Sequence, residues 1–154
     1  MEKAVFAAGC FWHVEESFQA VKGVVRTEVG FMGGSLKNPS YESVCTDRTG
    51  HAEVVYLEFD SRVVSYKDLL KVFWSVHNPT QKNRQGVDEG SQYRSAIFYY
   101  TSEQKEIAEL SRKEEQKKYR GVIVTEIVPA CVFYRAEEYH QSYLMKQGQK
   151  ACRI

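Results

Sequence analysis

The order of strand-like and helix-like segments constrains the fold of this chain more than any other feature. Lys3 to Ala8 is a short apolar run that ends at Gly9, and Cys10 to Ala20 then carries apolar residues at helical spacing. The same alternation continues along the chain. It predicts a mixture of strands and helices packed around one core.

Five segments rich in β-branched and aromatic residues predict strands, over residues 3–8, 24–31, 51–59, 95–100 and 122–128. Helical spacing predicts four helices, over 10–20, from the Ser65 cap to Asn78-Pro79, from the Ser102 cap to 119, and over 136–145. Two polar stretches, 32–50 and 80–94, predict long loops. The order predicts an α+β fold, with a ferredoxin-like βαββαβ core, an additional helix and strand, and an irregular C-terminal extension.

Composition narrows the class of protein. The 154 residues carry 21 Lys and Arg against 20 Asp and Glu, for a net charge of +1, and 43% are hydrophobic. We therefore expect a single domain over 1–154, with a flexible tail from about residue 146, and neither a nucleic-acid nor a membrane partner. No signal peptide is recognised ahead of the first strand, so we expect a cytoplasmic protein, and a monomer.

Four cysteines stand out in a chain expected to be intracellular, where permanent disulfides are rare: Cys10, Cys45, Cys131 and Cys152. Cys10 follows a strand and a glycine and opens a helix. Backbone N–H groups and the helix dipole at that position favour an anion, so we expect a stabilised thiolate. The alternative is that Cys10 is one more small buried residue.

Other residues offer acids and hydrogen-bond donors. His51 and Glu53 lie two apart on a predicted strand and therefore share a face. A Glu facing a pocket has its pKa raised by desolvation and can donate a proton at neutral pH. The alternative is an edge-strand Glu and a solvent-facing His. No His or Cys spacing typical of a metal site and no nucleotide-binding glycine motif occurs, so we expect neither a metal nor a cofactor.

Four ordered blocks resemble the A-type peptide-methionine sulfoxide reductases and cover nearly the whole chain. They are GCFWHVEESF at 9–18, YESVC with TGHAEVV at 41–45 and 49–55, NRQG with DEGSQYRS at 83–86 and 88–95, and AEEYHQSYL at 136–144. The resemblance implies an enzyme that reduces methionine-S-sulfoxide, free or in proteins, as part of the repair of oxidised proteins. It also implies thioredoxin or a similar dithiol as the reductant.

The resemblance also implies roles for individual residues. Cys10 would attack the sulfoxide sulfur and become a sulfenic acid, and Glu53 would protonate the sulfoxide oxygen. Tyr41 and Tyr93 would donate hydrogen bonds to the same oxygen. Asp88 would orient the two tyrosines or a water molecule. Phe11 and Trp12 would form a pocket for the methyl group of the sulfoxide.

A second thiol is needed to resolve the sulfenic acid. The family usually places it in a tail a short distance after the HQ-x-Y-L block, which points to Cys152, with Cys131 as the alternative. Cys45 is expected to be buried beside the site. The chain departs from the family pattern at Asn78, where Asp is common, and at Val87, where Asn is common.

Two other classes of function are weighed against this one. A cysteine hydrolase would use Cys10, His51 and an acid such as Asp88, and would need no reductant. A non-catalytic module would bind methionine-containing peptides at Phe11 and Trp12 without changing them.

Overall fold

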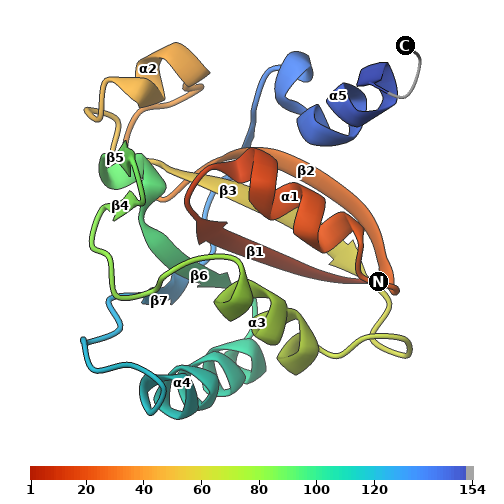
Figure 1. The fold of residues 1–154 in the computed structure, drawn as a ribbon, viewed down its shortest axis with the longest axis vertical. Helices are drawn as coiled ribbons and strands as arrows, with labels where there is room; N and C mark the ends of the chain where they lie inside the picture. Colours follow the sequence, from red (N-terminus) through yellow and green to blue (C-terminus); the bar gives the residue numbers. More distant parts are fainter. Residues whose placement is uncertain (152–154) are drawn as a thin grey trace.

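A computed structural model of the protein describes the backbone of residues 1–151 and side chains up to residue 148 (Figure 1). Cys152 therefore lies outside the described residues. The described part is built on one mixed sheet in the order β7-β6-β1-β3-β2-β8. Its strands are β1 (Glu2–Ala8), β2 (Val24–Met32), β3 (Ala52–Phe59), β6 (Ser95–Tyr99), β7 (Glu126–Pro129) and β8 (Tyr134–Arg135).

All neighbouring strands of this sheet run antiparallel except β6 and β7, which are parallel. A separate hairpin, β4 (Arg84–Gln85) and β5 (Asp88–Glu89), precedes the 3₁₀ turn Ser91–Tyr93. Five α-helices lie within the described residues: α1 (Phe11–Gln19), α2 (Tyr41–Cys45), α3 (Tyr66–Ser75), α4 (Ser102–Gln116) and α5 (Tyr143–Ala151).

The main core lies between one face of the sheet and the helices α1 and α3. Phe11, Val14 and Phe18 form the buried stripe of α1, at the spacing that the sequence predicts. Phe6 of β1 contributes to the same cluster and stacks on Phe18 with ring centroids 5.1 Å apart. The other face of the sheet holds a smaller cluster that includes Val54 and Phe98.

The α+β class is confirmed, and so are the strands over 3–8, 24–31, 51–59 and 95–100. The ferredoxin-like description of the core stays a prediction, because β7, β8 and the β4–β5 hairpin add to it. Ser65 is confirmed as an N-cap, since its side chain accepts a hydrogen bond from the Asp68 N–H. The second cap is wrong by one residue: Thr101 caps α4, and Ser102 is the first helical residue.

Three other sequence predictions need correction. The predicted loop over 32–50 contains α2, which begins at a capping box between Ser40 and Ser43. The strand predicted over 122–128 forms only from Glu126, as β7, because 122–125 make no strand pairing. The last helix begins at Tyr143 rather than at 136, and it continues to Ala151 through the expected irregular extension.

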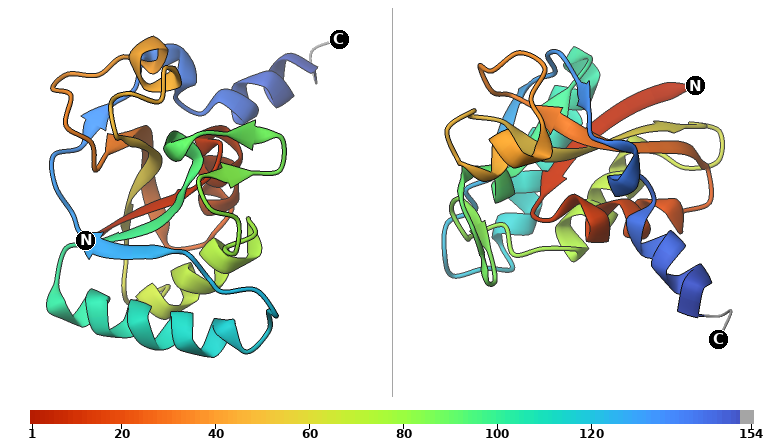
Figure 2. Two further views of the ribbon diagram at one scale, coloured as in Figure 1. Left: turned by 90° about the vertical axis from the view of Figure 1, so that its left-hand side faces the viewer. Right: turned by 90° about the horizontal axis from the view of Figure 1, so that it is seen from above.

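The helix α5 projects from the body of the molecule, beyond the sheet and α1 (Figure 2). In the part of the chain that the structure describes, none of the helices combines the length and apolar character that a membrane crossing needs.

Candidate active site

The turn between β1 and α1 places Cys10 at the N-cap of the helix. Gly9 makes this turn with φ +93°, a conformation that L side chains rarely adopt. A Cβ atom at Gly9 would also lie 2.9 Å from the Gln85 side chain of the β4–β5 hairpin. Both the positive φ and the close approach of Gln85 therefore require glycine at this position. The turn places Cys10 next to the β4–β5 hairpin.

Glu53 faces the start of α1 from strand β3, where it pairs in register with Phe31 of β2. The residue is 2% exposed, and its Oε1 accepts a hydrogen bond from the Phe11 N–H at 3.2 Å. Its Oε2 is buried and has no protein partner. Burial raises the pKa of Glu53 to about 8, so the carboxyl group is mostly protonated at neutral pH. This matches the buried acid that the sequence reasoning weighed against an edge-strand Glu.

The acidity of Cys10 differs from the sequence prediction. Burial is the largest effect and raises the pKa of the thiol to about 11, although the backbone N–H groups of Trp12 and His13 lower it. The carboxyl groups of Glu53 and Asp88 raise it further. The prediction of a stabilised thiolate is therefore wrong for the free protein, because desolvation outweighs the helix N-terminus.

Tyr41 and Tyr93 reach the same region from two different elements. Tyr41 is the first residue of α2, and Tyr93 ends the 3₁₀ turn after β5. Burial raises the pKa of Tyr93 to about 12, and the charges of Glu53, Asp88 and Cys10 add to this shift. The pKa of Tyr41 is also raised by burial. Both phenols therefore keep their protons at neutral pH and remain hydrogen-bond donors.

Aromatic rings pack beside Cys10. Phe11 is buried and packs at 5.8 Å from Phe31 and 6.3 Å from Tyr41, between ring centroids. Trp12 is half-buried, and its indole Nε1 donates to His140 Nδ1 at 3.0 Å. Trp12 also stacks on Tyr143 with centroids 3.9 Å apart. The two residues after Cys10 thus make an apolar surface whose orientation is set by the C-terminal segment.

His140 is a site residue that sequence reasoning did not single out. Its ring lies 4.3 Å from that of Tyr41 and 5.3 Å from that of Phe11, and the side chain is 1% exposed. The only sequence signal was its place in the block at 136–144. A histidine distant in sequence from the other site residues gives no pattern that local spacing can detect.

His51 does not belong to the site. Its Nδ1 accepts a hydrogen bond from the Gly34 N–H at 3.0 Å, and its Nε2 lies 2.7 Å from the Leu36 carbonyl oxygen. Both ring nitrogens therefore fix the 34–36 loop, and the alternative of a solvent-facing His is also wrong, since His51 is 2% exposed. The hypothesis of a cysteine hydrolase built on Cys10, His51 and Asp88 therefore lacks its general base.

The remaining cysteines differ in their surroundings. Cys45 is exposed rather than buried, but it lies beside Tyr41, since it contributes to the raised pKa of that phenol. Cys131 is exposed. Cys10, Cys45 and Cys131 are all free thiols. Among the described residues, no cluster of three or more His, Cys, Asp or Glu side chains could hold a metal ion.

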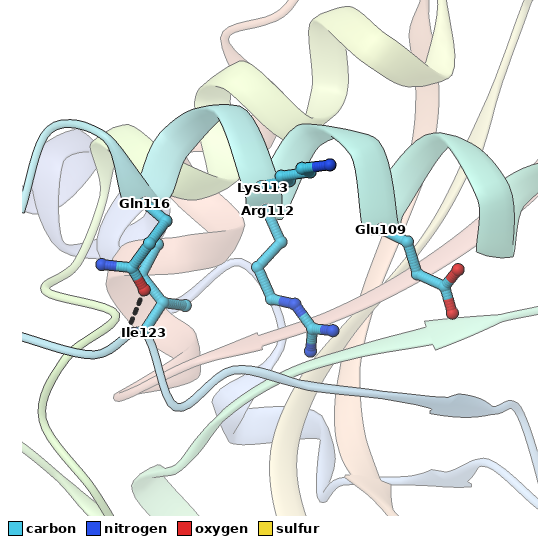
Figure 3. Close-up of a pocket in the computed structure, with 5 residues that line it drawn as sticks. All are labelled: Glu109, Arg112, Lys113, Gln116 and Ile123. Atoms are coloured by element: carbon cyan, nitrogen blue, oxygen red, sulfur yellow. Dashed lines mark hydrogen bonds between the residues drawn. The ribbon is translucent and has the colours of Figure 1, made fainter.

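A concave region lies along α4, away from this site. It has a volume of about 410 Å³ and is lined by Glu109, Arg112, Lys113, Gln116 and Ile123 (Figure 3). Arg112 Nη1 donates to the Thr125 carbonyl at 3.0 Å, and Gln116 Oε1 accepts from the Ile123 N–H at 2.8 Å. These polar groups hold the 121–125 segment against α4 and offer no reactive group.

Comparison with known proteins agrees with this geometry. The family profile described as peptide methionine sulfoxide reductase matches residues 2–154. The chain is 60% identical over 153 residues to "Peptide methionine sulfoxide reductase MsrA" of Methanothermobacter thermautotrophicus, covering 98% of this chain and 90% of that one. It is 57% identical over 147 residues to "Peptide methionine sulfoxide reductase A2" of Arabidopsis thaliana, covering 96% and 67%.

Solved structures are similar as well. Mxr1 from Saccharomyces cerevisiae in reduced form matches with a TM-score of 0.91 and 34% identity, over 96% of this chain and 86% of that one. Methionine sulfoxide reductase A of Corynebacterium diphtheriae matches with a TM-score of 0.86 and 39% identity, over 96% and 75%. The chain belongs to the peptide methionine sulfoxide reductase family and is a peptide-methionine (S)-S-oxide reductase.

Proposed function

We propose that Cys10 is the nucleophile and Glu53 the general acid in the reduction of methionine-S-sulfoxide, free or in proteins. The observation that carries this proposal is the buried, unpartnered Oε2 of Glu53 at the start of the helix that Cys10 opens. A carboxyl group with a pKa of about 8 holds a proton at neutral pH and can give it to a sulfoxide oxygen.

The first step transfers one oxygen atom. Glu53 protonates the sulfoxide oxygen, which makes the sulfur electrophilic, and the Cys10 sulfur attacks that sulfur to form an S–S bond. The hydroxyl group then passes to the Cys10 sulfur as the S–O and S–S bonds of this adduct break, and methionine leaves. The proton that Cys10 loses restores the acid form of Glu53. The products are methionine and a sulfenic acid on Cys10, so the sulfur of Cys10 is oxidised by two electrons as the sulfoxide is reduced.

The substrate itself completes the activation of Cys10. The thiol is protonated in the free protein, since its pKa is about 11. A polarised sulfoxide sulfur carries positive charge, and a positive charge beside the thiol favours the thiolate. Tyr41 and Tyr93 would donate hydrogen bonds to the same oxygen, and each such donor in a dry site is worth roughly 2–4 kcal/mol in the transition state.

The remaining roles follow from position. Phe11 and Trp12 would receive the methyl group of the sulfoxide by apolar contact. Asp88 would orient the phenols or a water molecule. His51 is not available as the base of an acyl transfer, because both of its ring nitrogens are engaged with the 34–36 loop.

The second step forms a disulfide. The Cys10 sulfenic acid and a second thiol, which we assign to Cys152, form one S–S bond and release water. The yeast protein Mxr1 has also been solved in complex with Trx2. We propose a thioredoxin-type dithiol as the reductant that returns this chain to its starting state, and repair of oxidised proteins in the cytoplasm as its role. We also propose that the chain is a monomer with one domain.

The Glu53→Gln variant tests the acid. The amide keeps a hydrogen-bond donor but has no acidic proton, so formation of methionine in a single turnover should slow by roughly 10²–10⁴-fold. Glu58→Gln, at the far end of the same strand, is the matched control and should react as the wild type does. A wild-type rate in Glu53→Gln would show that the proton comes from another group.

A further inference from the structure

The helix α1 has a second functional face beside its buried stripe. Trp12, Glu15 and Gln19 follow one another at spacings of three and four residues and therefore lie on one side of the helix. All three contact the C-terminal segment between His140 and Tyr143. The helix that opens at the nucleophile is thus also the dock for the segment that leads to Cys152.

Glu15 is the central contact of this dock. Glu15 is an acid, yet it is only 1% exposed. The neighbouring acid Glu16 is exposed, as is usual for a charged side chain on a helix. The Oε1 atom of Glu15 accepts a hydrogen bond from the Ser142 N–H at 2.7 Å, and its Oε2 accepts one from the Thr27 hydroxyl at 2.8 Å. The carboxyl group therefore joins α1, strand β2 and the C-terminal segment.

Ser142 adopts a backbone conformation that needs such support. Its φ is +52°, which is uncommon for a residue other than glycine and costs free energy. Glu15 holds its N–H, and Gln19 Nε2 donates to its hydroxyl at 3.0 Å. Because φ at Ser142 sets the direction of the chain that follows, these two side chains determine where α5 begins.

The chain before Ser142 is fixed independently. The Gln141 side chain accepts from the Val29 N–H at 2.9 Å and donates to the carbonyl oxygens of Val29 and Ala136. Ser142 is therefore the boundary between an anchored segment and α5, which projects from the body of the molecule (Figures 1 and 2).

Cys152 follows Ser142 by ten residues. The nine residues of α5 span about 13 Å as a helix, whereas ten extended residues reach about 33 Å. Unwinding the helix thus gives the tail the reach to return toward the start of α1, and the direction in which it leaves Ser142 affects how often Cys152 meets Cys10.

We propose that Glu15 is a positioning residue for the second chemical step: it holds Ser142 in its strained conformation and so directs the tail that delivers Cys152 to the Cys10 sulfenic acid. This inference rests on the proposed role of Cys152. The reaction needs no outside oxidant, because the sulfenic acid and the thiol give a disulfide and water.

The test separates the two chemical steps. Reduced protein is mixed with methionine-S-sulfoxide without reductant, and methionine and free thiols are followed by rapid quench. In Glu15→Ala, methionine should form at the wild-type rate, while loss of the second thiol should slow roughly tenfold, because the hydrogen bonds that the Ser142 N–H and the Thr27 hydroxyl donate to Glu15 are lost. Glu15→Gln keeps an acceptor for the Ser142 N–H and should stay within about threefold of wild type.

Glu16→Ala, a change of the same kind at the neighbouring exposed position, should leave both rates unchanged. Disulfide formation at the wild-type rate in Glu15→Ala would overturn the proposal. An equal slowing of methionine formation would also overturn it, since Glu15 would then have a general structural role.

Gln19→Ala provides a second test if Glu15→Ala does not fold. It removes the hydrogen bond to the Ser142 hydroxyl, together with a longer one to the Thr27 hydroxyl at 3.2 Å, and leaves the Glu15 contacts in place. It should slow disulfide formation by roughly threefold with normal methionine formation. A normal rate of disulfide formation in this variant contradicts the proposal. Cys152→Ser separates the two hypotheses: if it still loses two thiols, the assignment of Cys152 fails whatever the Glu15 variants show.

Discussion

At the residue scale, burial has the largest effect on the acidity of Cys10 and Glu53. It raises the pKa of Cys10 to about 11 and that of Glu53 to about 8, and in each case it is the largest cause. The sequence could suggest Glu53, because its position on a strand implies one buried face. It could not give the pKa of Cys10, because desolvation depends on residues from several elements that meet only in the fold.

Alkylation of Cys10 tests its acidity in the free protein. The rate of reaction with iodoacetamide, followed at Cys10 by mass spectrometry, should rise about tenfold per pH unit from pH 7 to 10, because the thiolate fraction rises in that proportion below a pKa of about 11. A rate that levels off near pH 7 would show that the helix N-terminus outweighs burial.

The free energy of unfolding should depend on pH because of Glu53. Its pKa is about 8 in the folded protein and near 4.5 in the unfolded chain, so the folded state binds the proton more tightly. The wild type should therefore lose stability relative to Glu53→Gln as the pH rises from about 4.5 to about 8, by a few kcal/mol. Urea unfolding of both proteins at pH 4.5 and 8 measures this. A difference that does not change with pH contradicts the assigned pKa.

Short elements position the donors at the scale of helices and strands. The α2 helix has only five residues, yet it carries Tyr41, and it begins at a capping box in which the Ser40 hydroxyl accepts the Ser43 N–H at 3.1 Å. The sequence predicted a loop there because five residues give too few positions to reveal helical periodicity. The long strands and α1 were predictable, since their apolar patterns continue over several turns or pairs.

Loss of the α2 cap should lower the activity, because Tyr41 is the first residue of this helix. Ser40→Ala removes the side-chain acceptor and should destabilise the helix start by about 1 kcal/mol, with a severalfold fall in kcat/KM for the sulfoxide. Ser40→Asp keeps an acceptor at the cap and should retain near-wild-type activity. Equal activities of the two variants would indicate that the cap does not position Tyr41.

The whole molecule joins residues that are far apart in the sequence into one site. The N-terminal turn supplies Cys10, the centre of the sheet supplies Glu53, and the C-terminal segment supplies His140 and Ser142. The contacts of Trp12 with His140 and of Glu15 with Ser142 each span more than 120 residues. No local pattern predicts such contacts, which explains why the sequence pointed to Cys10 but not to the contacts between α1 and the C-terminal segment.

Thiol accounting tests the proposed relay at this scale. One round with oxidised substrate and no reductant should remove two free thiols per chain in the wild type and in Cys131→Ser. Cys152→Ser should form one methionine but no intramolecular disulfide. Loss of two thiols in Cys152→Ser would transfer the resolving role to Cys131 or Cys45.

The most direct test of the central claim is an epimer-resolved single-turnover assay of the wild type and Cys10→Ser. Each protein is mixed with methionine-S-sulfoxide or methionine-R-sulfoxide, and methionine is measured. We expect the wild type to form methionine from the S epimer only, with one sulfenic acid or disulfide at Cys10, and Cys10→Ser to form none. Methionine formation by Cys10→Ser, or equal reduction of the R epimer by the wild type, would contradict the account.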